Sequence, residues 1–354
     1  MKRLLVLALL LIVAFMGWAE GAQESGDDST MVAFLLPTRE LPIWLAQGEQ
    51  LEATFDEAGY ETKVEFAEGV VERQVSQIEN AMLQGADYLV IAGVDPFALS
   101  GAVERAKEQG ATVIANDRLI MNTEAVDYYV TFDLFRLGEM QGQFIEEELG
   151  LDDGEEGPFT MEIVSGSPDD PNAQVFYDGQ MSVLRPYIEE GVLNVKSGQV
   201  AFRDTATPKW ESSAAQARME NVLGAYYSDD VLDVVLAAND STALGTISAL
   251  KSLGYGSDSR PFPIITGQDS ELTAIKSILR GEQSMTVFLD AKELSERVLD
   301  VVNALEDGDQ PETSTTFDNE VKEVPTVLYE PVIVTEDNWE IVIERGLYSE
   351  DDFE

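Results

Sequence analysis

The sequence predicts an α/β protein built from two lobes, each a parallel sheet covered by helices. Short runs rich in β-branched residues alternate with helical patterns at intervals of roughly 25 to 30 residues, which is the rhythm of strand–helix units in a parallel sheet. The runs form two series, separated by a segment of turn formers and acidic residues at 151–158. The length of 354 residues also favours two lobes, because a single hydrophobic core rarely grows to that size.

The predicted strands are short apolar runs bounded by glycine, proline or polar residues. The first series covers 32–36, 63–67, 88–92, 112–115 and 128–132. The second series covers 159–164, 195–200, 234–237, 263–266 and 285–289. Two series of equal size indicate two similar lobes.

Helices between the strands are predicted from apolar positions three or four residues apart. Val71, Val75, Ile78 and Met82 have this spacing, and Gly85 would end the helix that they form. Two further stripes have the same design: Leu51, Phe55 and Ala58 before Gly59, and Leu244, Ile247 and Leu250 before Gly254. We expect each stripe to pack on a sheet.

The N-terminal segment has the parts of a secretory signal peptide. Lys2-Arg3 precede an apolar run at 4–15, and a small-x-small cleavage signal follows at 19–21. The apolar run is shorter than the roughly 20 residues that a membrane-spanning helix needs. We therefore expect 1–21 to be removed, 22–30 to form a disordered leader, and the mature protein to act in the periplasm.

The composition excludes several classes of function. The chain has no Cys and no His, which removes disulfides, thiolate metal sites and the commonest general base, and we expect neither a metal nor a cofactor. The formal net charge is -45, from 67 acidic and 22 basic residues, so the chain would repel nucleic acid and anionic lipid. Because 44% of the residues are hydrophobic, the excess charge must lie mainly on a solvated surface, and we interpret it as an adaptation to high salt.

Polar clusters follow the carboxyl ends of the predicted strands, where open α/β sheets bind their ligands. The clusters are 37–39 with Trp44, 116–118, Asp133, 167–172, 239–240 and 268–269, and Trp210 lies in a later loop. Carboxylates, amides and a guanidinium can bond to sugar hydroxyls, and indoles can cover the apolar C–H faces of a sugar ring. The clusters therefore predict a sugar site.

Each cluster also has a purely structural interpretation. Asp117 and Asp133 could be helix N-caps or turn residues, and Asp240 is better explained as a cap than as a ligand. Arg118 could be a solvated surface charge, and the two tryptophans, taken singly, would be core residues. The common position at strand ends favours binding, since capping alone does not explain every cluster.

At these residues the chain resembles the periplasmic sugar-binding proteins of ABC transporters, specifically the xylose-binding and multiple-monosaccharide-binding group. The most specific stretches are 76–80, 116–120, 166–170 with Asn172-Ala173, 215–219, 267–269 and 330–335. The resemblance runs from about Val32 to the C-terminus and implies a type I periplasmic-binding-protein fold, with two Rossmann-like lobes and a three-segment hinge. We place the N-terminal lobe at 31–133 plus 289–328, and the C-terminal lobe at 134–288 plus 329–354.

The resemblance also implies roles for the site residues. Asp117 and Arg118 would hold sugar hydroxyls from the first lobe, and the second lobe would supply Asp170, Asn172, Asn239 and Asp269. Trp210 would stack on one face of the ring, and Trp44 would cover the other. Arg118 would also offset the buried charge of Asp269 or Asp170.

Three positions depart from the family pattern. Ile43 stands where the family commonly has Arg, Leu289 where it commonly has Lys, and Leu134 where it commonly has Asn. Two cationic donors are therefore missing, and Arg39 and Lys209 are the candidates to replace them. The sugar, or its anomer, would then differ from the usual ligand of the family.

The expected function is that of a monomeric binding component, not an enzyme. It would capture an aldose such as xylose, glucose, galactose or arabinose by hinge closure and deliver it to an ABC permease. An alternative is a sensor of a sugar or a furanosyl autoinducer, docking on a chemoreceptor or a membrane kinase. The signal peptide and the net charge disfavour a transcription factor, whereas a glycoside hydrolase would need a carboxylate pair such as Asp117 and Asp269.

Overall fold

The structure is a computed structural model that describes residues 30–353. The predicted signal peptide at 1–21 and the predicted leader up to residue 29 lie outside the described residues. From residue 30 to residue 353, no helix has the length and apolar character that crossing a membrane requires.

The first sheet has seven strands in the order β11-β12-β5-β4-β3-β1-β2, and all neighbours in it are parallel except β11 and β12. Its strands are β1 (Met31–Leu36), β2 (Glu61–Phe66), β3 (Tyr88–Ile91), β4 (Thr112–Asn116), β5 (Tyr128–Phe132), β11 (Thr315–Asp318) and β12 (Glu323–Tyr329). Its helices are α2 (Pro42–Ala58), α3 (Val71–Leu83), α4 (Ser100–Glu108) and α11 (Ala291–Glu306).

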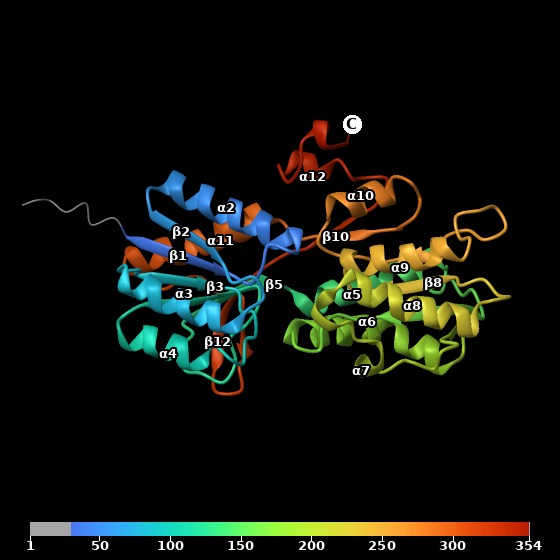
Figure 1. The fold of residues 1–354 in the computed structure, drawn as a ribbon, viewed down its shortest axis with the longest axis horizontal. Helices are drawn as coiled ribbons and strands as arrows, with labels where there is room; N and C mark the ends of the chain where they lie inside the picture. The colour runs from blue at the N-terminus through green and yellow to red at the C-terminus, as the bar shows by residue number, and fades with distance from the viewer. Residues whose placement is uncertain (1–29, 354) are drawn as a thin grey trace, which may run out of the picture. The chain divides into compact units, whose positions relative to one another are not determined.

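Helices cover both faces of this sheet, with α2 and α11 on one face and α3 and α4 on the other (Figure 1). In β1, Val32 and Phe34 pack towards α2 and α11, while Ala33 and Leu35 pack towards α3 and α4. A parallel strand buried on both faces must be apolar at every position, which explains why β1 reads as a continuous hydrophobic run.

The second sheet has four parallel strands in the order β7-β6-β8-β9. They are β6 (Phe159–Val164), β7 (Leu193–Asn194), β8 (Val234–Ala237) and β9 (Ile264–Ile265). Helices α5 (Leu134–Glu148) and α6 (Pro171–Glu189) cover one face, and α8 (Ser212–Tyr226) and α9 (Asp240–Ser252) cover the other. The short helices α7 (Phe202–Thr205) and η1 (Pro208–Trp210) precede α8.

Helices α5 and α6 pack with their main chains in contact. A Cβ atom at Gly138 would lie 2.1 Å from the carbonyl oxygen of Phe176, and one at Gly179 would lie 2.2 Å from that of Phe135. Since real Cβ atoms do not approach so closely, both positions require glycine. The start of α6, which carries residues of the cavity described below, is therefore fixed against α5.

A third, two-stranded sheet joins the C-terminal segment to the rest of the chain. Strand β10 (Thr286–Phe288) pairs antiparallel with β13 (Val332–Val334). Helix α10 (Leu272–Ile278) and the C-terminal α12 (Ile341–Glu344) lie beside this pair (Figure 1) and share an apolar cluster with it. The chain ends in η2 (Glu350–Phe353).

The predicted α/β class and the predicted helix ends are confirmed, but the predicted strand at 195–200 is wrong. These residues form a turn after β7, in which Gly198 has a left-handed φ of 68°. The main-chain nitrogen and the hydroxyl of Ser197 donate to the buried carboxylate of Glu162 at 3.0 and 2.6 Å. Because a buried carboxylate needs hydrogen-bond donors, these two groups bind Glu162 and are not available to pair with a neighbouring strand.

A second correction concerns the run at 285–289, which we expected to continue the second sheet. It forms β10, whose strand partner is β13. The sheet order also includes β11, which the strand patterns did not reveal because most of its residues are exposed and polar.

Candidate sugar site

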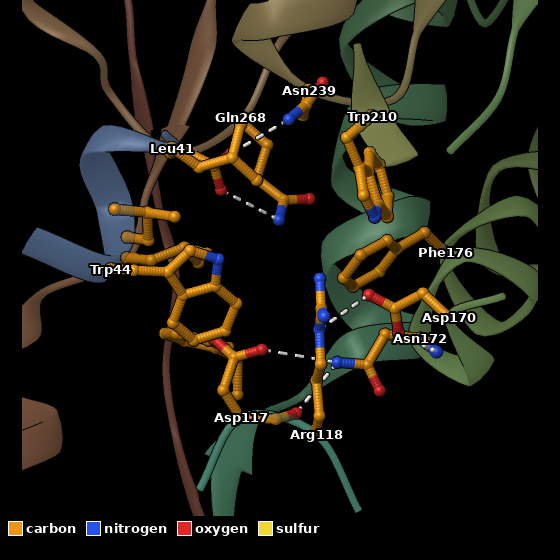
Figure 2. A pocket seen from close by; sticks show the side chains of 14 residues that line it. Leu41, Trp44, Asp117, Arg118, Asp170, Asn172, Phe176, Trp210, Asn239 and Gln268 are labelled. Atoms are coloured by element: carbon orange, nitrogen blue, oxygen red, sulfur yellow. Dashed lines mark hydrogen bonds and ion pairs between the residues drawn. The ribbon is translucent and has the colours of Figure 1, made fainter. Parts of the chain in front are cut away.

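A cavity of about 430 Å³, its mouth included, lies between side chains that follow the carboxyl ends of strands from both large sheets. The cavity brings together all eight residues that the sequence predicts to bind ligand: Trp44, Asp117, Arg118, Asp170, Asn172, Trp210, Asn239 and Asp269. Six further residues complete its lining: Leu41, Ile43, Phe132, Phe176, Gln268 and Leu289. Ten of the fourteen side chains are labelled in Figure 2.

Two indoles lie on opposite sides of this cavity (Figure 2). Trp44 is in the first turn of α2 and is 3% exposed, whereas Trp210 is in η1 and is 6% exposed. The ring of Phe176 meets Trp210 edge-on, with centroids 6.3 Å apart. Both indole nitrogens are buried and make no hydrogen bond within the described residues, so their N–H groups are free to donate to a ligand.

The position of Trp210 depends on a glycine and on a strained turn. A Cβ atom at Gly166 would lie 2.0 Å from Cη2 of the indole, so the ring occupies the space that a side chain would take. Lys209 and Trp210 have left-handed φ values of 55° and 59°, and the main-chain nitrogen of Lys209 donates to the hydroxyl of Ser167 at 2.9 Å. Backbone strain of this kind collects at binding sites, where it aims a side chain.

Asp117 follows β4 in a left-handed conformation, with φ 62°. Its main-chain nitrogen donates to the carbonyl of Val130 at 2.9 Å, and Gln47 donates to its carboxylate at 3.0 Å. Burial raises the pKa of Asp117 to about 7, although the Arg118 guanidinium and the Gln47 amide act against the shift. Asp117 is therefore a partly exposed acceptor at the cavity wall and does not cap a helix.

Arg118 is the one cation among the lining residues, and it faces three carboxylates. Its Nε lies 2.9 Å from Oδ2 of Asp170, and its Nη1 donates to the carbonyl of Gly93 at 3.1 Å. The guanidinium carbon also lies 5.1 Å from the centroid of the Trp44 ring, within the range of a cation–π contact. The surface interpretation of Arg118 is wrong, because its side chain is 11% exposed and paired.

Asp170 and Asn172 occupy the N-terminus of α6. Asp170 caps the helix, since its Oδ1 accepts from the main-chain nitrogen of Asn172 at 3.0 Å, and its Oδ2 remains for Arg118. The Asn172 amide donates to the main-chain oxygen of Asp117 at 2.8 Å. Capping thus sets the direction of both side chains.

Asn239 and Asp269 lie at the opposite end of the cavity. Asn239 caps α9 through Oδ1, while its Nδ2 donates to Oδ2 of Asp269 at 3.1 Å; Gln268 donates to Oδ1 of the same carboxylate at 3.2 Å. Burial, reinforced by the nearby Glu271 carboxylate, raises the pKa of Asp269 to about 7. Oε1 of Gln268 is buried and has no partner among the described residues, which leaves an acceptor free.

Two aspartates of the sequence clusters, Asp133 and Asp240, do not line the cavity. Asp133 caps α5 by accepting from the main-chain nitrogen of Arg136 at 2.9 Å, as its structural interpretation predicts. The capping role expected of Asp240 belongs to Asn239, and Asp240 instead accepts buried bonds from Gln283 and Thr286 at 2.8 and 3.0 Å.

Neither candidate replacement for the missing cations reaches the cavity. Arg39 is half-exposed, pairs with Glu68 and lies over the ring of Phe66. Lys209 is exposed, in the turn beside Trp210. Ile43 and Leu289 therefore line the cavity with no cation in their place.

Two residues that support the site were missed by the sequence clusters because they lie within helices. Phe176 is on α6 one turn after Asn172, and Gln47 is on α2 three residues after Trp44. Helical spacing puts both on the same helix face as a predicted site residue, since positions three and four apart share a face, but it does not show how that helix packs.

Comparisons with known proteins place the chain in a family. A family model described as a periplasmic binding protein domain matches residues 32–310. The multiple sugar-binding periplasmic receptor ChvE of Rhizobium radiobacter is 44% identical over 92% of both chains, and the D-xylose-binding periplasmic protein of Escherichia coli strain K12 is 36% identical over 82% of this chain and 83% of its own.

A solved structure is similar over the same region. It is an ABC transporter solute-binding protein from Clostridium phytofermentans with bound beta-D-glucose; it is 42% identical, covers 92% of this chain and 100% of its own, and has a TM-score of 0.87. The predicted periplasmic-binding-protein fold is confirmed, and the family is one of solute-binding proteins, not of enzymes. The chain belongs to the periplasmic sugar-binding proteins of ABC transporters.

Proposed function

We propose that this protein binds one monosaccharide in the cavity between Trp44 and Trp210 and delivers it to an ABC permease of the cytoplasmic membrane. The observation that carries the proposal is the convergence of carboxylates, amides, a guanidinium and two indoles from both large sheets on one cavity. Concave sites lined by apolar and aromatic side chains with a few convergent polar groups are typical of small-molecule sites.

The lining matches the chemistry of a pyranose ring. Ring hydroxyls both donate and accept, and they would meet the carboxylates of Asp117 and Asp269 as acceptors and Arg118 as donor. The two flat C–H faces would lie against the indoles, whose unpartnered N–H groups supply further donors. Hydrogen bonds to charged groups contribute about 1.5 to 3 kcal/mol each. A few of them therefore support micromolar binding, even after the entropic cost of ordering the ligand and the side chains is subtracted.

Relatives support a sugar ligand. Their names refer to multiple sugars and to D-xylose, and the similar solved structure holds beta-D-glucose. We therefore infer that this chain binds an aldose such as xylose, glucose, galactose or arabinose.

The mechanism that we infer is closure of the two lobes around the ring. The hinge would be the three connections between the sheets: Asp133 between β5 and α5, the segment 289–290 between β10 and α11, and the segment 330–331 between β12 and β13. A ligand that contacts residues from both lobes stabilises the closed form, which a permease can recognise. The lobe boundaries, the permease and the periplasmic location are parts of this proposal.

A panel of monosaccharides in a calorimeter tests the proposal. We expect micromolar or tighter binding of at least one aldose, and at least tenfold weaker binding by Asp269→Asn. Asp258→Asn, at an exposed loop position, makes the same charge change away from the cavity and is the matched control. Absence of heat with every aldose would contradict a sugar ligand.

A sensor role is the second candidate, because one relative is named a multiple sugar-binding periplasmic receptor. The closed protein would then dock on a chemoreceptor or a membrane kinase. Genes for an ATPase and a permease beside this gene would support transport, and a lone gene beside a receptor gene would support sensing.

A further inference from the structure

One edge of the cavity is aliphatic. Leu41, Ile43 and Leu289 line it, and Leu289 is 3% exposed. Nearly every other lining residue carries a hydrogen-bonding group or an aromatic ring. A ligand oriented by those groups must therefore turn its least polar edge towards these three side chains.

A second, smaller cavity lies behind this edge. Ile43, Leu289 and Asp269 line both cavities, so the aliphatic side chains of Ile43 and Leu289 form part of the partition between them. The rest of the second lining is mostly apolar and consists of Pro42, Ala46, Glu271, Ala291, Leu347 and Tyr348.

No cation serves this edge among the residues that line either cavity. The Arg118 guanidinium is held by Asp170 and by the Gly93 carbonyl. The charged residues that line the second cavity are carboxylates, Asp269 and Glu271, and the hydroxyl of Tyr348 donates to the carbonyl of Ser270 at 3.0 Å. An anionic substituent placed here would meet the like charges of Asp269 and Glu271, and no cationic side chain lines the second cavity to offset them.

The pyranose position that matches an apolar edge is C5. In an aldopyranose C1 to C4 all carry hydroxyls, whereas C5 carries hydrogen in a pentose, methyl in a 6-deoxyhexose, hydroxymethyl in a hexose and carboxylate in a uronic acid. We propose that Ile43 and Leu289 read the substituent on C5, so that the protein prefers pentopyranoses and 6-deoxyhexopyranoses to hexoses and rejects uronic acids. This specificity rests on the proposed function.

Two sets of sugars that differ only at C5 test the specificity by calorimetry. The first is L-arabinose, 6-deoxy-D-galactose, D-galactose and D-galacturonate, and the second is D-xylose, 6-deoxy-D-glucose, D-glucose and D-glucuronate. In at least one set we expect the pentose and the 6-deoxy sugar to bind about tenfold tighter than the hexose. The hexose binds more weakly because its 6-hydroxyl would lose its hydrogen bonds to water beside the aliphatic side chains. The uronate should bind about a hundredfold more weakly than the 6-deoxy sugar.

The outcomes separate this specificity from the proposed function. A hexose or a uronate that binds as tightly as its 6-deoxy partner, in the set with measurable heat, overturns the role of Ile43 and Leu289. No heat with any of the eight sugars would instead overturn the sugar site itself.

A charge placed at the partition gives a second readout. Ile43→Arg should raise the affinity for the uronate at least tenfold and lower that for the 6-deoxy sugar. Leu45→Arg adds the same charge two residues along α2, at a side chain that is 37% exposed and lines neither cavity, and should leave the order of affinities unchanged. Equal effects of the two variants would show that general charge, not the partition, sets the selectivity.

Discussion

The amide of Asn172, on α6, donates at 2.8 Å to the main-chain oxygen of Asp117, which follows β4 of the other large sheet. The Arg118–Asp170 ion pair spans the same gap at 2.9 Å. Two protein contacts therefore join the walls of the cavity directly. The strength of these two contacts contributes to the free energy needed to separate the two walls of the cavity.

Asn172→Asp should weaken this junction. The new carboxylate would face the main-chain oxygen of Asp117 and its Oδ1, which is 3.4 Å from the present amide, so a donor becomes a repelling acceptor. We expect a larger radius of gyration in small-angle X-ray scattering without sugar, and at least tenfold weaker sugar binding. Gln174→Glu, an exposed position on the same helix, is the control and should change neither quantity.

Gly166→Ala should reduce binding although Gly166 does not line the cavity. The added Cβ would displace the Trp210 indole, whose Cη2 occupies that position. We expect about tenfold weaker sugar binding and a changed tryptophan fluorescence spectrum. Gly224→Ala is the matched control: its Cβ would meet nothing within 4 Å, and alanine inside α8 should stabilise the helix by about 0.5–1 kcal/mol. Unchanged affinity in Gly166→Ala would show that the indole position is not critical.

The raised pKa of Asp117 makes the stability of the protein depend on pH. The pKa is about 7 in the folded protein and near 4 in an unfolded chain, so between these values the folded state holds more protons than the unfolded state. The free energy of unfolding should therefore fall as the pH rises from about 4 to 7. Asp117→Asn should flatten this slope and raise the melting temperature at pH 7.5.

Asp258→Asn controls for the general loss of one negative charge, because Asp258 is exposed. Melting curves of the wild type and both variants at half-unit pH steps make the comparison. Parallel curves for wild type and Asp117→Asn would contradict a protonated Asp117 in the folded state.

The net charge of -45 should make the protein more stable in salt. Self-repulsion between exposed carboxylates is screened over a Debye length that falls from about 10 Å at 0.1 M to about 3 Å at 1 M. We expect the melting temperature to rise steadily from low to molar NaCl. A betaine series at matched osmolality is the control, because betaine changes water activity without screening charges. An equal rise of the melting temperature in betaine, or no rise in NaCl, would argue against a high-salt adaptation.

The sequence predicted the cavity lining well because carboxyl ends of parallel strands meet at one edge of a sheet. Residue type and position alone could not separate Asp117 from Asp133, since both are aspartates after a strand; only the family resemblance assigned a ligand role to Asp117. The difference is set three residues later: Arg136 presents a free main-chain nitrogen to Asp133, whereas the chain after Asp117 forms no helix there.

Residues within helices were harder to predict than residues at strand ends. The place of Phe176 in the cavity depends on how α6 sits on α5, which the local pattern does not determine. The turn at 195–200 likewise depends on Glu162, a buried carboxylate more than thirty residues away in the chain. Long-range contacts of this kind leave no periodic signal.

The glycine contact between α5 and α6 has a mechanical consequence. With Gly138 and Gly179 backbone to backbone, the two helices cannot slide past one another and would turn as one lever. The lever begins at Leu134, directly after the connection at Asp133, and carries Asn172 and Phe176. A small twist of the main chain at Asp133 would thus swing one wall of the cavity as a rigid arm.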